Sequence, residues 1–180
     1  SDLQQVTMFG SSFDPRWSPD GRTITFGRSG TQEEVGIWFG HLADSTFTKF
    51  GFGATPADWS LGGNRVVYDK TQIVVADTSR VDSTQLTSND AVDNRYPAWS
   101  PNGDWITWAP LPEGQPFFEL WVMRSDGTEQ KKLVDRGREP AWGPRSDRIV
   151  FSRPAADSAY TALWTIRRDG TNLRQITDPS

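Results

Sequence analysis

Short apolar segments alternate with turn-forming segments along the whole chain. In the stretch from 96 to 134, segments rich in aromatic and β-branched residues are separated by turns such as Pro101-Asn102-Gly103 and Ser125-Asp126-Gly127. Such segments favour β-strands, and such triplets favour tight turns. The pattern predicts four strands here, at 96–100, 105–108, 118–123 and 130–134. No segment combines a helical period with helix caps, so the sequence predicts an all-β protein.

Adjacent pairs of large apolar residues interrupt a simple alternation of inward and outward positions. Trp38-Phe39 and Trp121-Val122 are two such pairs. A sheet with one solvated face places every second side chain in water, whereas a sheet covered on both faces accepts apolar residues at consecutive positions. The pairs therefore predict sheets that are buried on both faces.

The four-strand pattern occurs four times. A Pro-x-Trp-Ser-like motif recurs with its tryptophan at positions 17, 59, 99 and 142, which are 42, 40 and 43 residues apart. A repeat of this length with four short strands per unit is typical of a β-propeller, whose blades pack face to face. The sequence predicts one domain, 1–180, with four four-stranded blades at 8–51, 52–88, 89–135 and 136–177. The four motif tryptophans are expected in the core between blades.

Composition narrows the choice of partners. The net charge of −4 and the pI near 5.0 argue against a nucleic-acid partner, which favours a basic surface. No apolar run approaches the length of a membrane-spanning helix, so no membrane insertion is expected. The chain has no cysteine, which excludes disulfides and thiolate metal sites and fits an exported protein as well as a cytosolic one. No signal peptide is visible, and a mature protein would lack one.

The repeated motif resembles that of the TolB-like branch of β-propellers, a WD-type repeat family. That repeat centres on Pro-x-Trp-Ser-Pro-Asp-Gly, followed by an Ile-x-Phe strand and then by Leu-Trp with an Asp-Gly turn. Residues 15–26 match the first part, and Leu120-Trp121 with Asp126-Gly127 match the second. The second unit departs most, because Leu61-Gly62 replaces the turn Pro-Asp. The resemblance covers nearly the whole chain.

Three properties are implied by the resemblance. Members of the family usually have six or more blades, are often exported, and bind partner proteins, so the resemblance implies a periplasmic or extracellular protein with a protein or peptide partner. Some propellers of related sequence accompany peptidase domains, and others carry a metal-dependent lyase site built with several histidines. This chain has only His41, so a histidine-rich metal centre cannot be transferred to it.

The two ends of the chain carry similar segments. Residues 3–7 parallel residues 173–177, and both resemble the fourth strand of a blade. Propellers commonly close by adding an amino-terminal strand to the last blade, so one of the two segments is surplus in a four-bladed ring. The chain is therefore a closed ring with a loose end, half of a larger ring, or a piece of a longer propeller. We expect self-association, most simply two copies that form an eight-bladed ring.

Long connections are expected on one face of the propeller, where function concentrates. They are 8–14, 28–36, 89–95, 110–117, 136–139 and 154–160. Residues just before each first strand are expected to surround the mouth of the central channel on that face. The candidate partner-binding residues are Phe13, Asp14, Thr55, Arg95, Tyr96, Arg138 and Glu139. Aromatic residues with arginine are typical of protein-binding hot spots, although the same residues could serve only to cap the packing of the blades.

A metal site is a weaker interpretation of the acidic residues. Asp90, Asp93 and Glu139 could supply oxygen ligands to a hard cation such as calcium. Their spacing lacks the dense acidic pattern of a calcium-binding loop, and Asp and Asn in loops more often close turns with their own backbone. No metal and no cofactor are therefore expected.

Catalytic residues are not evident. His41 has no identified carboxylate or nucleophile partner, and Ser18, Ser60 and Ser100 recur at one position of the repeat, where a role in the turn is expected. We therefore expect a non-enzymatic scaffold that binds a protein or peptide through its long-loop face and associates with itself. The alternative is an accessory propeller domain, a gate or substrate platform, of a larger hydrolase or other enzyme. A carbohydrate-active or metal-dependent enzyme is a third and weaker interpretation.

Overall fold

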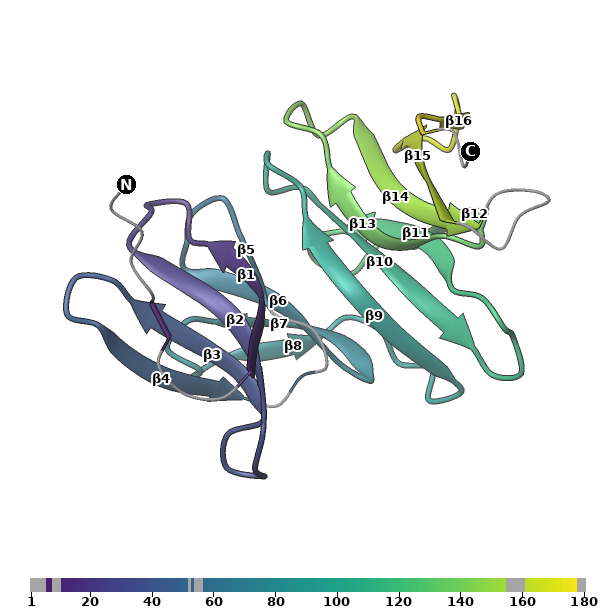
Figure 1. Ribbon diagram of the computed structural model, residues 1–180. Helices are drawn as coiled ribbons and strands as arrows, with labels where there is room; N and C mark the ends of the chain where they lie inside the picture. The colour runs from purple at the N-terminus through teal and green to yellow at the C-terminus, as the bar shows by residue number, and fades with distance from the viewer. Residues whose placement is uncertain (1–5, 8–10, 52, 54–56, 155–160, 178–180) are drawn as a thin grey trace.

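The computed structural model describes residues 6–7, 11–51, 53, 57–154 and 161–177. Within these residues all regular structure is β, which confirms the predicted fold class. The strands form four sheets of four antiparallel strands each, and in each sheet the strands follow one another in chain order (Figure 1). Each sheet is one blade of a propeller. The predicted strand at 3–7 falls mostly outside the described residues, and Val6 and Thr7 are not in a strand.

The strands are as follows. The first blade contains β1 (Ser11–Trp17), β2 (Thr23–Ser29), β3 (Gly36–His41) and β4 (Thr46–Gly51), and the second contains β5 (Asp58–Trp59), β6 (Arg65–Lys70), β7 (Gln72–Asp77) and β8 (Ser83–Gln85). The third blade contains β9 (Val92–Trp99), β10 (Trp105–Pro112), β11 (Glu119–Arg124) and β12 (Lys131–Asp135), and the fourth contains β13 (Arg138–Trp142), β14 (Arg148–Pro154), β15 (Thr161–Arg167) and β16 (Arg174–Gln175).

Strand β10 continues into the segment that the sequence predicts as a proline-rich loop. It pairs with β9 as far as Pro112, opposite Val92, whereas its pairing with β11 ends at Trp108, opposite Trp121. Beyond Trp108 the strand has a partner on one side only. Proline is tolerated at such an edge because its missing N–H is not required there.

The motif serines hold the turns between the first two strands of a blade. The Ser18 hydroxyl accepts the backbone N–H of Thr23 at 2.9 Å, and the Ser100 hydroxyl accepts that of Trp105 at 2.9 Å. The Ser60 hydroxyl receives the N–H of Arg65 at 3.2 Å. The recurrence of serine is thus explained by the turn, as the sequence predicts, because the hydroxyl replaces a backbone acceptor.

Aspartates close a second set of turns, mostly between the third and fourth strands. The Asp126 carboxylate accepts the N–H and the hydroxyl of Thr128, at 2.9 and 2.7 Å, and Asp169 does the same with Thr171, at 2.8 and 2.6 Å. These bonds stabilise the ionised carboxylate, so the pKa of each aspartate is lowered. The turn sequence Asp-Gly-Thr therefore has a direct structural reason.

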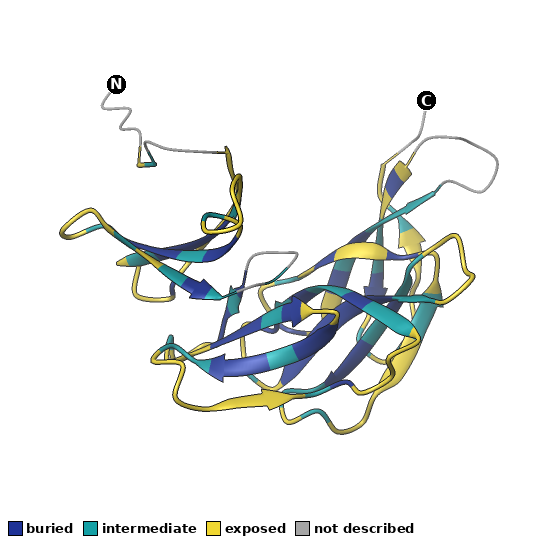
Figure 2. Ribbon diagram, turned by 90° about the horizontal axis from the view of Figure 1, so that it is seen from below, coloured by how far each residue is buried: buried dark blue, intermediate teal, exposed yellow. Residues whose placement is uncertain are grey.

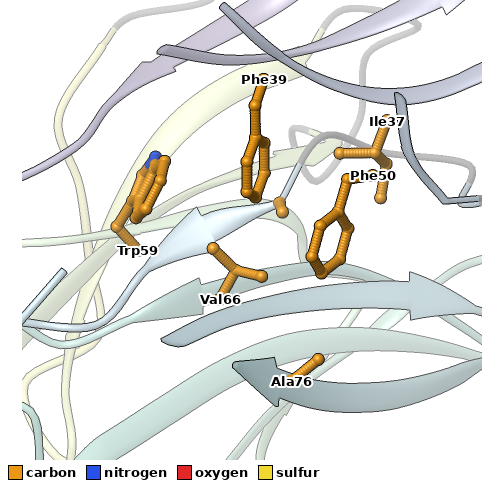
Figure 3. Close-up of a cluster of buried hydrophobic side chains, with 7 residues drawn as sticks. Ile37, Phe39, Phe50, Trp59, Val66 and Ala76 are labelled. Atoms are coloured by element: carbon orange, nitrogen blue, oxygen red, sulfur yellow. The ribbon is translucent and has the colours of Figure 1, made fainter. Parts of the chain in front are cut away.

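The hydrophobic core lies between neighbouring blades, in three clusters that we call the first, second and third joints. In the first joint, Phe39 lies between Phe50 and Trp59, with ring centroids 4.7 and 5.3 Å apart (Figure 3). Phe39 and Phe50 belong to the first blade and Trp59 belongs to the second. The motif tryptophan of the second blade is therefore covered by the third and fourth strands of the first.

The second and third joints repeat this arrangement. Trp99 of the third blade packs with Ile73 and Val75 of the second blade, and Trp142 of the fourth blade packs with Leu120 and Val134 of the third. Both faces of the two middle blades are thus covered, as the adjacent apolar pairs in the sequence predict.

Polar contacts also tie neighbouring blades together. The Asp58 carboxylate accepts the backbone N–H of Trp99 at 2.7 Å, and the Trp142 indole N–H donates to the Ala98 carbonyl at 3.0 Å. The Thr25 hydroxyl donates to the Ala57 carbonyl at 2.6 Å. Buried polar groups require such partners, so these contacts fix the position of each blade against the next.

The four blades form an open arc. The first and fourth blades lie at opposite ends of the molecule in both views (Figures 1 and 2), and among the described residues their strands make no substantial contact. The arc has two end faces. We call the face of the first blade that carries Ser12 and Trp17 the amino-terminal face, and the face of the fourth blade that carries Leu163 and Ile176 the carboxy-terminal face.

The expectation that all four motif tryptophans are buried is wrong for Trp17. Its exposed fraction is 63%, against 9% for Trp59 and 7% for Trp99. Among the described residues, no blade precedes β1 to cover Trp17. Phe26, on the same face, is nevertheless buried, and it packs edge-on against Phe47 of its own blade at 6.1 Å.

Candidate functional site: the central cavity

Three inner strands carry the same backbone distortion. Asp14, Tyr96 and Glu139 have φ angles of 49°, 55° and 53°, and each directly precedes the proline of the repeated motif. The pairing of each inner strand with its neighbour shifts register at this point, which defines a β-bulge. The left-handed conformation is costly for residues other than glycine. The repeat therefore maintains a strained bulge at an equivalent place in three blades.

The bulges face a cavity between the inner strands. The cavity has a volume of about 500 Å³ and is lined by side chains from all four blades, including Asp14, Arg16, Asp58, Tyr96, Glu139 and Trp142. A bulge re-aims side chains that a regular strand would direct elsewhere. The volume falls within the range of ligand-binding clefts.

The Tyr96 bulge is held from the neighbouring blade. Its backbone N–H donates to the Asp69 carboxylate at 3.2 Å, and Asp69 is fully buried on β6. The Tyr96 ring contacts Phe118 edge-on, with centroids 5.6 Å apart. Burial raises the pKa of Tyr96, and the nearby Glu139 adds to the increase. The raised pKa favours the protonated form of the phenol.

Asp58 is a carboxyl group with a raised pKa in the wall of the cavity. Burial raises its pKa, which opposes the effect of the hydrogen bond from the Trp99 N–H and of the Arg16 charge. The carboxylate is positioned by the bond to the Trp99 N–H, so it remains fixed at the cavity wall. A cationic or hydrogen-bond-donating group of a ligand would find an ordered acceptor there.

The candidate residues predicted from the sequence line different pockets of the structure. Asp14, Tyr96 and Glu139 line the cavity together. Arg138 lines a smaller pocket of about 260 Å³ beside Phe117 and Phe118, between the third and fourth blades.

The remaining candidates lie apart from the cavity. Arg95 forms an ion pair with Asp93 at 2.9 Å. The Phe13 ring lies over Gly27 of the adjacent strand, where it would collide with any side chain at that position. Thr55 lies outside the described residues.

Sequence reasoning missed Arg16 and Asp58. In the repeat they occupy one position, directly before the motif tryptophan, where the third and fourth blades have Ala98 and Ala141. Two blades have a charged residue at this repeat position, whereas the other two have alanine. This difference could have identified the position as one that points into the cavity rather than into a joint.

Asp93, Glu139 and His41, which were considered for metal binding or catalysis, contact other side chains. Asp93 pairs with Arg95, and the Glu139 carboxylate accepts the Ser152 hydroxyl at 3.0 Å. His41 Nδ1 lies 3.4 Å from the Thr23 hydroxyl. Among the residues that the structure describes, no cluster of three or more His, Cys, Asp and Glu side chains could hold a metal ion. In the same part of the chain, no helix has the length and apolar character needed to cross a bilayer.

Comparison with known proteins shows the fold. No protein-family model matches the sequence, and no curated protein matches it. A putative TolB from Agrobacterium tumefaciens is 22% identical, with a TM-score of 0.75 over 90% of this chain and 63% of that protein. An oligogalacturonate lyase in complex with manganese is 13% identical, with a TM-score of 0.67 over 96% of this chain and 55% of the lyase.

A third likeness is to a prolyl endopeptidase structure from a study of inter-domain dynamics in catalysis and specificity. It is 13% identical, with a TM-score of 0.66 over 94% of this chain and 29% of the endopeptidase. The chain therefore has a TolB-like propeller fold, which also occurs in enzymes. It spans less than two thirds of the length of each of these proteins.

Proposed function

We propose that this protein is a non-enzymatic scaffold that binds a protein or peptide partner through the long-loop face of the propeller, at the central cavity. One observation carries the proposal: three non-glycine residues adopt a strained conformation at equivalent positions, and all three side chains line one cavity. Backbone strain of this kind is often concentrated at functional sites. Presenting Asp14, Tyr96 and Glu139 to a partner supplies that reason.

The composition of the cavity favours a peptide segment or a protruding loop as its ligand. A volume of about 500 Å³ accommodates a few side chains rather than a whole protein surface. Tyrosine and arginine are frequent at binding hot spots, and both Tyr96 and Arg16 line the wall. We further propose a periplasmic or extracellular location, on the basis of the TolB-like repeat.

The test uses a phage-displayed library of short random peptides, selected on the wild-type protein. We expect one sequence motif to be enriched, and a synthetic peptide that carries it should bind at least about tenfold more weakly to Tyr96→Gly. Glycine suits the left-handed backbone, so this variant removes the ring without straining the bulge. The control is Val81→Ala, at an exposed side chain in the β7–β8 turn. Absence of an enriched motif, or equal binding by both variants, would overturn the proposal.

A second candidate is an accessory propeller domain that acts as a gate or substrate platform in a larger enzyme. It is favoured by the likeness to the prolyl endopeptidase, of which this chain matches only 29%. The two candidates are separated by gene context, because a hydrolase domain encoded on the same polypeptide would favour the second.

We also propose that the protein associates with itself. The open arc supports this, because Trp17 is exposed on the amino-terminal face and Leu163 and Ile176 are exposed on the carboxy-terminal face. Contiguous exposed apolar surface marks association sites.

A further inference from the structure

We propose that the peptide bound at the central cavity also carries an acidic side chain, which enters a neighbouring pocket and binds Arg136 and Arg138. The pocket lies between the third and fourth blades and has a volume of about 260 Å³, and these two arginines line it together with Phe117, Phe118 and Pro154, among others. We call it the arginine pocket. The inference depends on the peptide binding proposed above and specifies the chemistry of the peptide.

The positive charge of the arginine pocket is not balanced within the pocket. Among the described residues that line it, two are arginines and none is acidic. Arg136 forms no ion pair with any residue that the structure describes. The Arg138 Nε lies 3.9 Å from the Glu139 carboxylate, and both side chains are about half exposed. An exposed pair at this distance contributes little attraction, so both guanidinium groups can bind a carboxylate from a ligand.

The third blade carries at the equivalent place the counter-ion that the fourth blade lacks. Arg95 and Arg138 each lie four positions before the motif tryptophan of their blade, and Asp93 and Arg136 each lie six positions before it. In the third blade the Asp93 carboxylate binds Arg95 at 2.9 Å. In the fourth blade an arginine occupies the position of this aspartate. An acidic side chain of a ligand would supply the counter-ion that the third blade provides for itself.

The segment that carries the two arginines is held firmly by its neighbours. The Arg136 guanidinium carbon lies 4.6 Å from the centre of the Phe117 ring, which is a favourable cation–π contact. The Gly137 N–H donates to the Phe118 carbonyl at 2.9 Å, so the residue between the arginines is tied to the third blade. A Cβ atom at Gly137 would lie only 2.9 Å from the Leu120 Cβ. The two guanidinium groups are therefore presented from a closely packed backbone.

The arginine pocket adjoins the central cavity. Arg138 lines the pocket, and the next residue, Glu139, lines the cavity. The β-bulge at Glu139 re-aims its side chain relative to that of Arg138. On another wall, the Phe118 ring of the pocket contacts the Tyr96 ring of the cavity, with centroids 5.6 Å apart. An extended peptide spans about 3.3 Å per residue, so we expect the acidic residue about two to four positions from the residue that enters the cavity.

The central cavity offers a different chemistry from the arginine pocket. Its described lining contains three carboxyl groups, those of Asp14, Asp58 and Glu139, and one guanidinium group, that of Arg16. Like charges repel one another at short range, so an acidic side chain of the peptide is directed to the arginine pocket instead. An arginine can bind a carboxylate there through two parallel N–H···O bonds, which add geometric specificity to the attraction.

The experiment repeats the selection of random peptides on the wild-type protein and on Arg136→Asp. This substitution gives the fourth blade the residue that Asp93 provides in the third, and aspartate tolerates the left-handed backbone at this position, where φ is 60°. We expect Asp or Glu at one position of the motif enriched on the wild type, and no such preference on the variant. The synthetic wild-type motif peptide should bind Arg136→Asp at least about tenfold more weakly, because charge-assisted bonds are lost.

Two further variants, measured with the same peptide by isothermal titration calorimetry, assign the effect to the pocket. Arg138→Gln removes the other guanidinium and should weaken binding by about three- to tenfold, and it tests the pocket independently if Arg136→Asp unfolds. Arg145→Asp makes the same change of net charge as Arg136→Asp, at an exposed arginine in the β13–β14 turn. Its affinity should stay within about twofold of the wild type, because distant surface charges are screened. Equal weakening by Arg145→Asp would overturn the proposal.

The outcomes separate this inference from peptide binding itself. An enriched motif without an acidic residue, whose peptide still binds more weakly to Tyr96→Gly, would overturn the role of the arginine pocket and leave the central cavity as the binding site. The same conclusion would follow if an acidic motif peptide bound the wild type, Arg136→Asp and Arg138→Gln equally well. Absence of any enriched motif would overturn both proposals.

Discussion

Trp99 and Trp17 occupy equivalent positions of the repeat, yet Trp99 is buried in the second joint and Trp17 is exposed on the amino-terminal face. Their strands have the same neighbours within the blade, and their turns are held by the same serine hydroxyl contact. The difference in exposure, 7% against 63%, comes from the presence or absence of a preceding blade. A blade of this protein therefore supplies only half of the environment that its motif tryptophan requires.

The largest expected effect separates these two tryptophans directly. Trp99→Ala should lower the free energy of unfolding by about 3–5 kcal/mol, because it removes a large buried side chain and leaves a cavity in the second joint. Trp17→Ala should lower it by less than about 1 kcal/mol when the protein is dilute enough to be monomeric. Urea unfolding followed by tryptophan fluorescence and by circular dichroism measures both values. Equal losses would contradict the assigned difference in burial.

A smaller effect is expected from the polar tie at the second joint. Asp58→Ala leaves the Trp99 N–H without its 2.7 Å acceptor and should cost about 1–3 kcal/mol of unfolding free energy. Asp58→Asn keeps a carbonyl oxygen at that place and should cost less. Denaturant titration at neutral pH compares the two variants. If Asn proved as damaging as Ala, the hydrogen bond would not be the reason for the aspartate.

The smallest expected effects are changes of folding stability with pH. They have opposite signs for Asp58 at the second joint and for the aspartates in the turns. The pKa values of Asp126 and Asp169 are lowered, so these turns contribute stability above the unfolded pKa that is lost as the pH falls through the lower folded values. Burial raises the pKa of Asp58, so its contribution instead declines as the pH rises from about 4 through the folded pKa.

Stability measured between pH 2 and pH 7 in the wild type, Asp169→Asn and Asp58→Asn separates these contributions. The difference between the wild type and Asp169→Asn should shrink as the pH falls. The wild type should lose stability relative to Asp58→Asn as the pH rises above about 4. The same trend in both variants would contradict the opposite shifts.

The fold was predictable from the sequence because the same local interactions recur in successive units of the repeat. Each motif serine accepts a turn N–H, and the Asp-Gly-Thr segments of the third and fourth blades close hairpins with the aspartate carboxylate. These are local interactions within a few residues, so local sequence carries them. Adjacent apolar pairs likewise indicated blades covered on both faces, and the three joints confirm this for the second and third blades.

The candidate site was only partly predictable. Asp14, Tyr96 and Glu139 were chosen from their place before the first strands, and they do line one cavity. Their left-handed backbone could not be read from the sequence, because a residue before proline ordinarily favours an extended conformation. The part played by Asp58 depends on the N–H of Trp99, which is 41 residues away in sequence. The exposure of Trp17 depends on what lies against its face of the blade, and a repeat motif alone does not say that.

The order of contacts along the chain has a consequence for how the protein is made. Within the described residues, each joint unites two consecutive blades and none unites distant ones. A nascent chain can therefore add one blade at a time as it leaves the ribosome, and each new motif tryptophan finds the preceding blade already in place.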